Sequence, residues 1–105
     1  MIFVELPAFT GPGLFDDDAL SRIQLRLLAS PLAGDLIPGG SGLRKLRVPL
    51  PGRGKRGGAR VIYYWYASRE TCYLIHAYSK NRQSGLTPRQ LKLLTRAMGE
   101  VLGYG

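Results

Sequence analysis

Two neighbouring runs of aromatic and β-branched residues constrain the fold of this chain more than any other feature. Residues 59–66 read ARVIYYWY and residues 71–79 read TCYLIHAYS, with only the four residues ASRE between them. Such compositions favour β-strands, and so short a connection favours an antiparallel hairpin. The sequence therefore predicts a sheet built around this hairpin.

Two further strands are predicted from the N-terminal half. Residues 2–6 (IFVEL) form a short apolar run that ends at Pro7, which is followed by turn signals. Residues 43–50 (LRKLRVPL) alternate in character, and a period of two places Lys45 and Arg47 on the same face of a strand.

Two helices are predicted, one before and one after the three later strands in the sequence. Residues 16–30 begin with three aspartates, which suit the positive end of a helix, and carry apolar residues at helical spacing. Residues 87–103 begin with Thr87 as N-cap, Pro88 in the first turn and Gln90 three residues after the cap. That spacing is typical of a capping box.

The order strand, helix, three strands, helix predicts an α+β fold. We expect a single domain over residues 1–105, with a small, mostly antiparallel β-sheet packed against helices. One face of this sheet must meet the helices, and we expect the other face to stay wet and carry charge.

The positive charge is concentrated in one third of the chain. The formal net charge is +8, and the segment from Leu36 to Arg69 holds no carboxylate. The cations of this segment are Arg44, Lys45, Arg47, Arg53, Lys55, Arg56, Arg60 and Arg69. Such a concentration attracts phosphates and favours a nucleic-acid partner. A merely soluble basic loop, or a docking patch for an acidic protein, is the alternative.

A glycine-rich basic loop precedes the hairpin. Residues 51–60 read PGRGKRGGAR, which matches the dinucleotide-binding spacing of glycines but leads into a strand rather than a helix. We interpret the glycines as allowing close approach to a ligand, with Arg53, Lys55 and Arg56 reaching for phosphates. A flexible hairpin loop without a ligand is the alternative.

Lys45, Arg47 and Arg60 are the candidates for chemistry. Lys45 and Arg47 share a strand face, and Arg60 begins the next strand. Three neighbouring cations suit phosphoryl chemistry, in which they hold the scissile phosphate and stabilise developing charge, with Lys45 as a candidate base. They are otherwise ordinary charges on an open sheet face.

The remaining special residues predict no catalytic triad, metal site or cofactor. His76 is the only histidine, and in an apolar strand we expect it to be structural, with one hydrogen bond. Cys72 is the only cysteine, and we expect a small buried hydrophobe. The chain has no secretory signal and no run long enough to cross a membrane, so we expect a cytoplasmic protein.

Tyr78 begins a second basic patch, YSKNRQ, at the end of the last predicted strand. Tyrosines beside cations suit single-stranded RNA, whose bases stack on aromatic rings. We therefore expect Tyr78 to stack on a base, with Asn81 and Arg82 nearby.

Four segments, in order, resemble the RelE-superfamily toxins of bacterial toxin–antitoxin pairs, most closely the HigB-type branch. They are GGSGLRKLRVP, GKRGGARVIYYW, YLIHAYSKN and LTPRQLKLL, and the resemblance covers roughly residues 35–94. It implies a compact sheet flanked by helices. It also implies ribosome-dependent, metal-independent cleavage of messenger RNA, in which a 2′-hydroxyl attacks the adjacent phosphate.

The resemblance also implies roles for individual residues. By position, Lys45 and Arg47 resemble the family's strand lysine and arginine, one acting as base and the other holding phosphate. Arg60 resembles the arginine that stabilises the transition state, and Lys80 falls near the basic residue at the last strand's end. Asn81 stands where RelE has an arginine, and Tyr104 is no clear counterpart of its catalytic tyrosine, so the general acid is unassigned. The predicted RNA contacts are Arg44, Arg53, Lys55, Arg56, Tyr78, Asn81 and Arg82.

The implied partners are a cognate antitoxin, and the 70S ribosome with mRNA in its decoding site. Two other functions stay open. ParE-type members share the fold but act on DNA gyrase, so fold alone does not decide function. A noncatalytic RNA-binding module would use the same basic patch.

Overall fold

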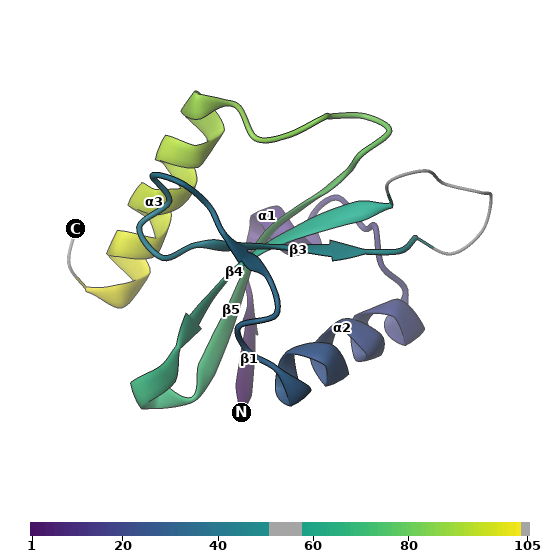
Figure 1. The fold of residues 1–105 in the computed structure, drawn as a ribbon, viewed down its shortest axis with the longest axis horizontal. Helices are drawn as coiled ribbons and strands as arrows, with labels where there is room; N and C mark the ends of the chain where they lie inside the picture. The colour runs from purple at the N-terminus through teal and green to yellow at the C-terminus, as the bar shows by residue number, and fades with distance from the viewer. Residues whose placement is uncertain (51–57, 104–105) are drawn as a thin grey trace.

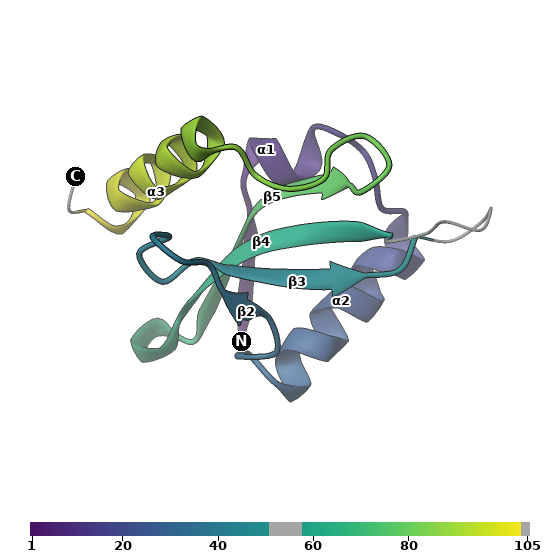
Figure 2. The same cartoon turned by 45° about the horizontal axis from the view of Figure 1, so that its top comes forward.

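A mixed five-stranded sheet forms the centre of the protein, with the strand order β1-β5-β4-β3-β2. The computed structural model describes residues 1–50 and 58–103. The strands are β1 (Ile2–Glu5), β2 (Asp35–Leu36), β3 (Arg44–Val48), β4 (Ala59–Tyr66) and β5 (Thr71–Ser79). Figures 1 and 2 show β3, β4 and β5 running side by side through the middle of the molecule.

The predicted hairpin and the α+β class are confirmed. β4 and β5 pair antiparallel around the short turn η1 (Ala67–Arg69), β3 pairs antiparallel with β4, and β2 pairs antiparallel with β3. Only β1 is parallel to its neighbour, β5, among the described strands. The sheet is thus mostly antiparallel, as expected.

The helices are α1 (Pro7–Thr10), α2 (Asp17–Ala29) and α3 (Pro88–Leu102). The predicted caps of α2 and α3 are present. Asp16 accepts a hydrogen bond from the Ala19 backbone N–H at 2.8 Å, and Thr87 and Gln90 form the capping box. The short helix α1 and the two-residue strand β2 were not predicted, because segments of that length carry no periodicity.

Helices cover both faces of the sheet, so the expectation of one open face was wrong. On one face, Ile23 and Leu27 of α2 pack with Leu46, Val61 and other buried residues of the sheet. On the opposite face, Met98 of α3 packs with a second cluster of buried residues, Leu43, Ile62, Tyr73, Ile75 and Tyr78. Figure 1 shows α2 and α3 on opposite sides of the strands. Charged residues must therefore lie where a helix does not reach.

Cys72 is 1% exposed within the α2-side core, as predicted for a small buried hydrophobe. Burial raises the pKa of its thiol to about 12, because the thiolate would lose its hydration. Of the helices that the structure describes, none is long and apolar enough to span a membrane.

Candidate functional site

A row of three polar side chains crosses the sheet on the face that carries α3. Arg47 of β3 is the Cα partner of Arg60 in β4, and Arg60 is the partner of Tyr78 in β5. Directly opposed residues of antiparallel strands project to the same face, about 5 Å apart. Lys45 lies two residues before Arg47 and shares that face, as the alternation predicted.

This row lines an open pocket of ≈ 320 Å³. The lining residues are Asp35, Lys45, Arg47, Arg60, Tyr78, Lys80 and Ser84. The structure therefore brings together the four residues predicted to be catalytic, and it adds Asp35 and Ser84, which were not predicted. We refer to it as the cationic pocket.

The two arginines of the pocket are held differently. Arg60 is 6% exposed, and its Nη1 donates to the Ala59 carbonyl oxygen at 3.1 Å. Arg47 is exposed, but its backbone carbonyl accepts a hydrogen bond from Nη1 of Arg26 in α2 at 2.9 Å. Arg60 is consequently the more rigid of the two, while Arg47 has freedom to follow a ligand.

Lys80 is fixed at the rim of the pocket by two hydrogen bonds. Its backbone N–H donates to the Gly58 carbonyl oxygen at 2.9 Å, and its Nζ donates to the Ser84 carbonyl oxygen at 2.6 Å. Gly58 has a φ of +54°, and a Cβ there would collide with the Val48 carbonyl oxygen, so only glycine suits this position. An ammonium group has three N–H donors, so Lys80 keeps two for a ligand.

Tyr78 lines the pocket but is only 6% exposed. Burial raises the pKa of its hydroxyl, and the positive charge of Arg60 acts in the opposite direction. A ring so covered presents little face for a base, so the predicted stacking role does not suit this geometry. The hydroxyl, held beside Arg60, is the part that suits a ligand contact.

Asp35 enters the pocket from β2, where it is the Cα partner of Lys45. The sequence did not indicate it, because residues 31–42 have the composition of a loop and β2 has only two residues. The one available signal was its position as the last carboxylate before the cation-rich segment.

Arg44, one of the predicted RNA contacts, does not line the cationic pocket. It lies on the α2 face of β3, and its Nη1 donates to the Gly34 carbonyl oxygen at 2.8 Å. Tyr63 supports the same loop, because its hydroxyl donates to the Pro31 carbonyl at 2.8 Å and accepts from the Gly34 N–H at 2.9 Å. Arg44 therefore anchors a loop and does not reach the cationic pocket.

The other predicted RNA contacts are outside the pocket or outside the described residues. Asn81 and Arg82 are exposed in the turn after β5 and do not line the pocket. Arg53, Lys55 and Arg56 of the glycine-rich loop lie outside the described residues, as does Tyr104.

His76 does not line the cationic pocket. Burial lowers its pKa, and the Ala8 backbone opposes this effect. The expected hydrogen bond is not found, since neither ring nitrogen has a partner with good geometry among the described residues. Within residues 1–50 and 58–103, no three or more His, Cys, Asp and Glu side chains are grouped in a way that suits a metal ion.

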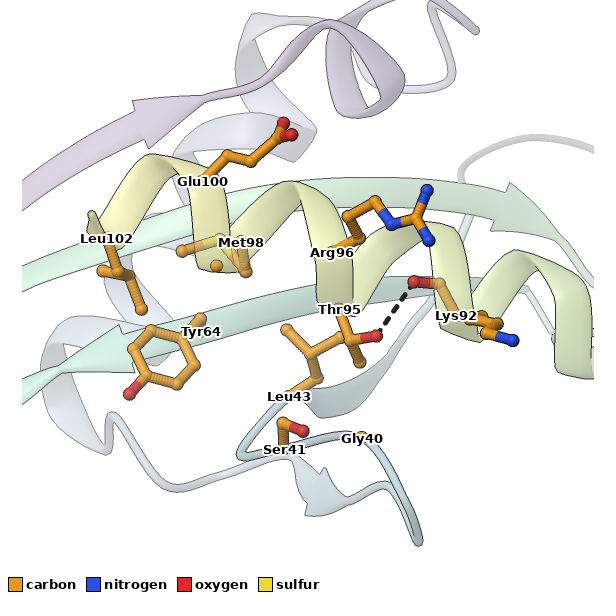
Figure 3. Close-up of a pocket in the computed structure, with 11 residues that line it drawn as sticks. Gly40, Ser41, Leu43, Tyr64, Lys92, Thr95, Arg96, Met98, Glu100 and Leu102 are labelled. Atoms are coloured by element: carbon orange, nitrogen blue, oxygen red, sulfur yellow. Dashed lines mark hydrogen bonds between the residues drawn. The ribbon is translucent and has the colours of Figure 1, made fainter. Parts of the chain in front are cut away.

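A second pocket, of ≈ 600 Å³, lies between α3 and the loop before β3. Figure 3 shows Leu43, Tyr64, Met98 and Leu102 around its apolar part, with Lys92 and Arg96 on the exposed side of the helix. A hydrogen bond from Thr95 Oγ1 to the Lys92 carbonyl, 2.9 Å, stays within α3. This pocket shares no residue with the cationic pocket.

Comparison with known proteins gives one family. A family model described as the RelE toxin of the RelE / RelB toxin–antitoxin system matches residues 16–104. Among solved structures, the chain is similar to a free-state double arginine-to-alanine mutant of the E. coli toxin RelE. The two are 13% identical with a TM-score of 0.58, and the match covers 92% of this chain and 95% of that one. At this identity the structural likeness supports the shared fold alone.

Proposed function

Because this chain belongs to the RelE toxin family, we propose that it is a toxin that cleaves messenger RNA on the ribosome. The observation that carries the proposal is the convergence of Lys45, Arg47, Arg60 and Lys80 on one open pocket. Four cations that meet from two strands, β3 and β4, and from the turn after β5 form a site for a phosphate.

The chemistry that fits this pocket is transfer of the phosphoryl group to the neighbouring 2′-oxygen. Arg47 and Arg60 bind the scissile phosphate and stabilise the charge that develops on its oxygens. Lys45 adds positive charge beside Arg47. Lys80, as a protonated amine, supplies a proton to the leaving 5′-oxygen. The products are a 2′,3′-cyclic phosphate and a free 5′-hydroxyl.

An antitoxin is the partner that family membership implies. An acidic segment of that antitoxin would complement the cationic pocket and exclude RNA from it. We also place the chain in the HigB-type branch, on the four quoted segments, and we expect the ribosome to hold the messenger RNA over the pocket.

The test uses purified protein with 70S ribosomes programmed with a defined message, beside the same message without ribosomes. We expect cleavage only with ribosomes, products that end in a 2′,3′-cyclic phosphate, and at least about 100-fold slower cleavage by Arg60→Ala. Arg96→Ala, on α3 and outside the cationic pocket, is the matched control and should cleave like the unchanged protein.

The same preparations distinguish the other functions. Gyrase supercoiling blocked by the protein, with intact message, would replace the proposal with gyrase inhibition. Salt-sensitive RNA binding without any cleavage would replace it with a noncatalytic binding module.

A further inference from the structure

Asp35 is an anomaly in the cationic pocket. It is the one carboxylate among the described residues that line the pocket, and it stands opposite Lys45 in the β2–β3 pair. An anion in a phosphate site weakens phosphate binding through repulsion. Its presence therefore points to a task other than holding the phosphate.

Within residues 1–50 and 58–103, no side chain pairs with the carboxylate of Asp35. Among the described residues, its side chain makes no hydrogen bond. The ion pair that these residues form joins Arg22 to Asp18 on α2 and does not involve Asp35. Asp35 is also exposed, so its oxygens are open to a ligand. An ionised carboxylate only accepts hydrogen bonds, whereas a lysine must first lose a proton before it accepts one.

Asp35 and Lys80 lie on opposite sides of the arginine pair. The strand order β5-β4-β3-β2 places Asp35 on the outer strand, Arg47 and Arg60 on the two strands between, and Lys80 directly after β5. At about 4.8 Å per strand, β2 and β5 are ~14 Å apart. In-line displacement needs the attacking and leaving oxygens on opposite sides of phosphorus, and this arrangement matches that need.

We propose that Asp35 is the general base of the cleavage reaction, an assignment that rests on the proposed function. A carboxylate oxygen of Asp35 takes the proton of the 2′-hydroxyl, and the 2′-oxygen forms a bond to phosphorus. The bond from phosphorus to the 5′-oxygen breaks, and that oxygen leaves with a proton from Lys80. The phosphate stays between Arg47 and Arg60. Lys45, predicted as a candidate base, then acts as a phosphate contact.

The first experiment compares single-turnover cleavage on programmed ribosomes with ribosome affinity. Asp35→Asn keeps the shape of the side chain but accepts a proton poorly, so we expect cleavage about 100-fold slower. Ribosome affinity should stay equal or rise, because a negative charge is removed from the pocket. Asp17→Asn makes the same charge change on α2, outside the pocket, and should cleave normally.

The second experiment is chemical rescue. Asp35→Ala leaves room for formate, and formate should accelerate this variant at least about 10-fold over matched sodium chloride, if an added base replaces the lost one. Formate should not accelerate Arg47→Ala, which lacks a phosphate contact rather than a base.

The outcomes separate the two proposals. If the unchanged protein cleaves no message, the proposed function fails and the assignment fails with it. If it cleaves and Asp35→Asn cleaves equally well, only the assignment is overturned. The assignment is also overturned if Asp35→Asn loses as much ribosome affinity as it loses cleavage. It is likewise overturned if Asp35→Ala is slow and formate does not accelerate it. Either result would favour a role for Asp35 in orienting Lys45.

Discussion

Arg47 and Arg60 lie directly opposite each other on antiparallel strands, so two guanidinium-bearing side chains share one face of the sheet. Like charges in this position destabilise a sheet by roughly 0.2–1 kcal/mol. Retaining this pair lowers the stability of the fold but keeps two cations in place to bind an anion. Arg60 cannot move away, because it is 6% exposed, and Arg47 is exposed beside it.

Removing one of these two charges should stabilise the fold but slow RNA cleavage. Arg47→Gln is expected to raise the free energy of unfolding by up to ~1 kcal/mol at low salt, and to slow cleavage at least about 10-fold. Urea denaturation at low salt and at about 1 M salt measures the effect. The gain should disappear at high salt, where the screening length is ~3 Å. A lower stability for Arg47→Gln at low salt would contradict this account.

Arg44 should affect stability rather than cleavage. Its bond to the Gly34 carbonyl and the bonds of Tyr63 hold the loop before β2. Tyr63→Phe is expected to cost about 1–3 kcal/mol, because it leaves the buried Gly34 N–H without its acceptor. Arg44→Ala should also lower the urea midpoint, yet cleave normally at a temperature where it is folded. Impaired cleavage by a stably folded Arg44→Ala would show instead that Arg44 contributes to RNA binding or cleavage.

The fold class followed from local patterns, and the cationic pocket followed in part. The β4–β5 hairpin and the capping box of α3 depend on residues that are neighbours in the sequence, so both were predicted. Lys45 and Arg47 were placed together correctly because alternation along one strand is also local. Arg60 joined them because β3 and β4 are consecutive strands of the sheet.

What the sequence could not predict depends on residues far apart in the chain. Alternation put Arg44 and Lys45 on different faces, but only the packed helices decide which face has an open pocket. Asp35 is brought to the pocket by a two-residue strand, which has no pattern of its own. The burial of Tyr78 likewise depends on tertiary packing that no strand pattern contains.

The stability of the protein should fall in mild acid because of His76. Burial holds the pKa of His76 below its usual 6.5, so the unfolded chain binds this proton more readily than the folded protein does. The stabilising effect of keeping His76 neutral is complete above about pH 6.5 and is lost as the pH falls below that value. His76→Leu should flatten the pH dependence of the urea midpoint between about pH 7 and 5. An unchanged pH dependence in this variant would contradict burial of the neutral ring.

The segment that follows Lys80 is tied to α3 by Gln90. Its side-chain oxygen accepts from the Thr87 N–H at 3.0 Å and from Gln83 Nε2 at 2.8 Å. Gln90→Ala should therefore lower the free energy of unfolding by ~1 kcal/mol, whereas Gln90→Glu keeps an acceptor and should stay close to the unchanged protein. Thermal or urea denaturation of the three proteins decides this. Equal stabilities would show that the capping box contributes nothing.

The most direct measurement is a map of RNA 5′ ends after brief induction of the protein, beside Arg60→Ala and Lys45→Ala expressed to the same level. We predict new 5′-hydroxyl ends inside translated messages for the unchanged protein, and none for either variant. Arrested growth without any new ends would contradict RNA cleavage by the cationic pocket.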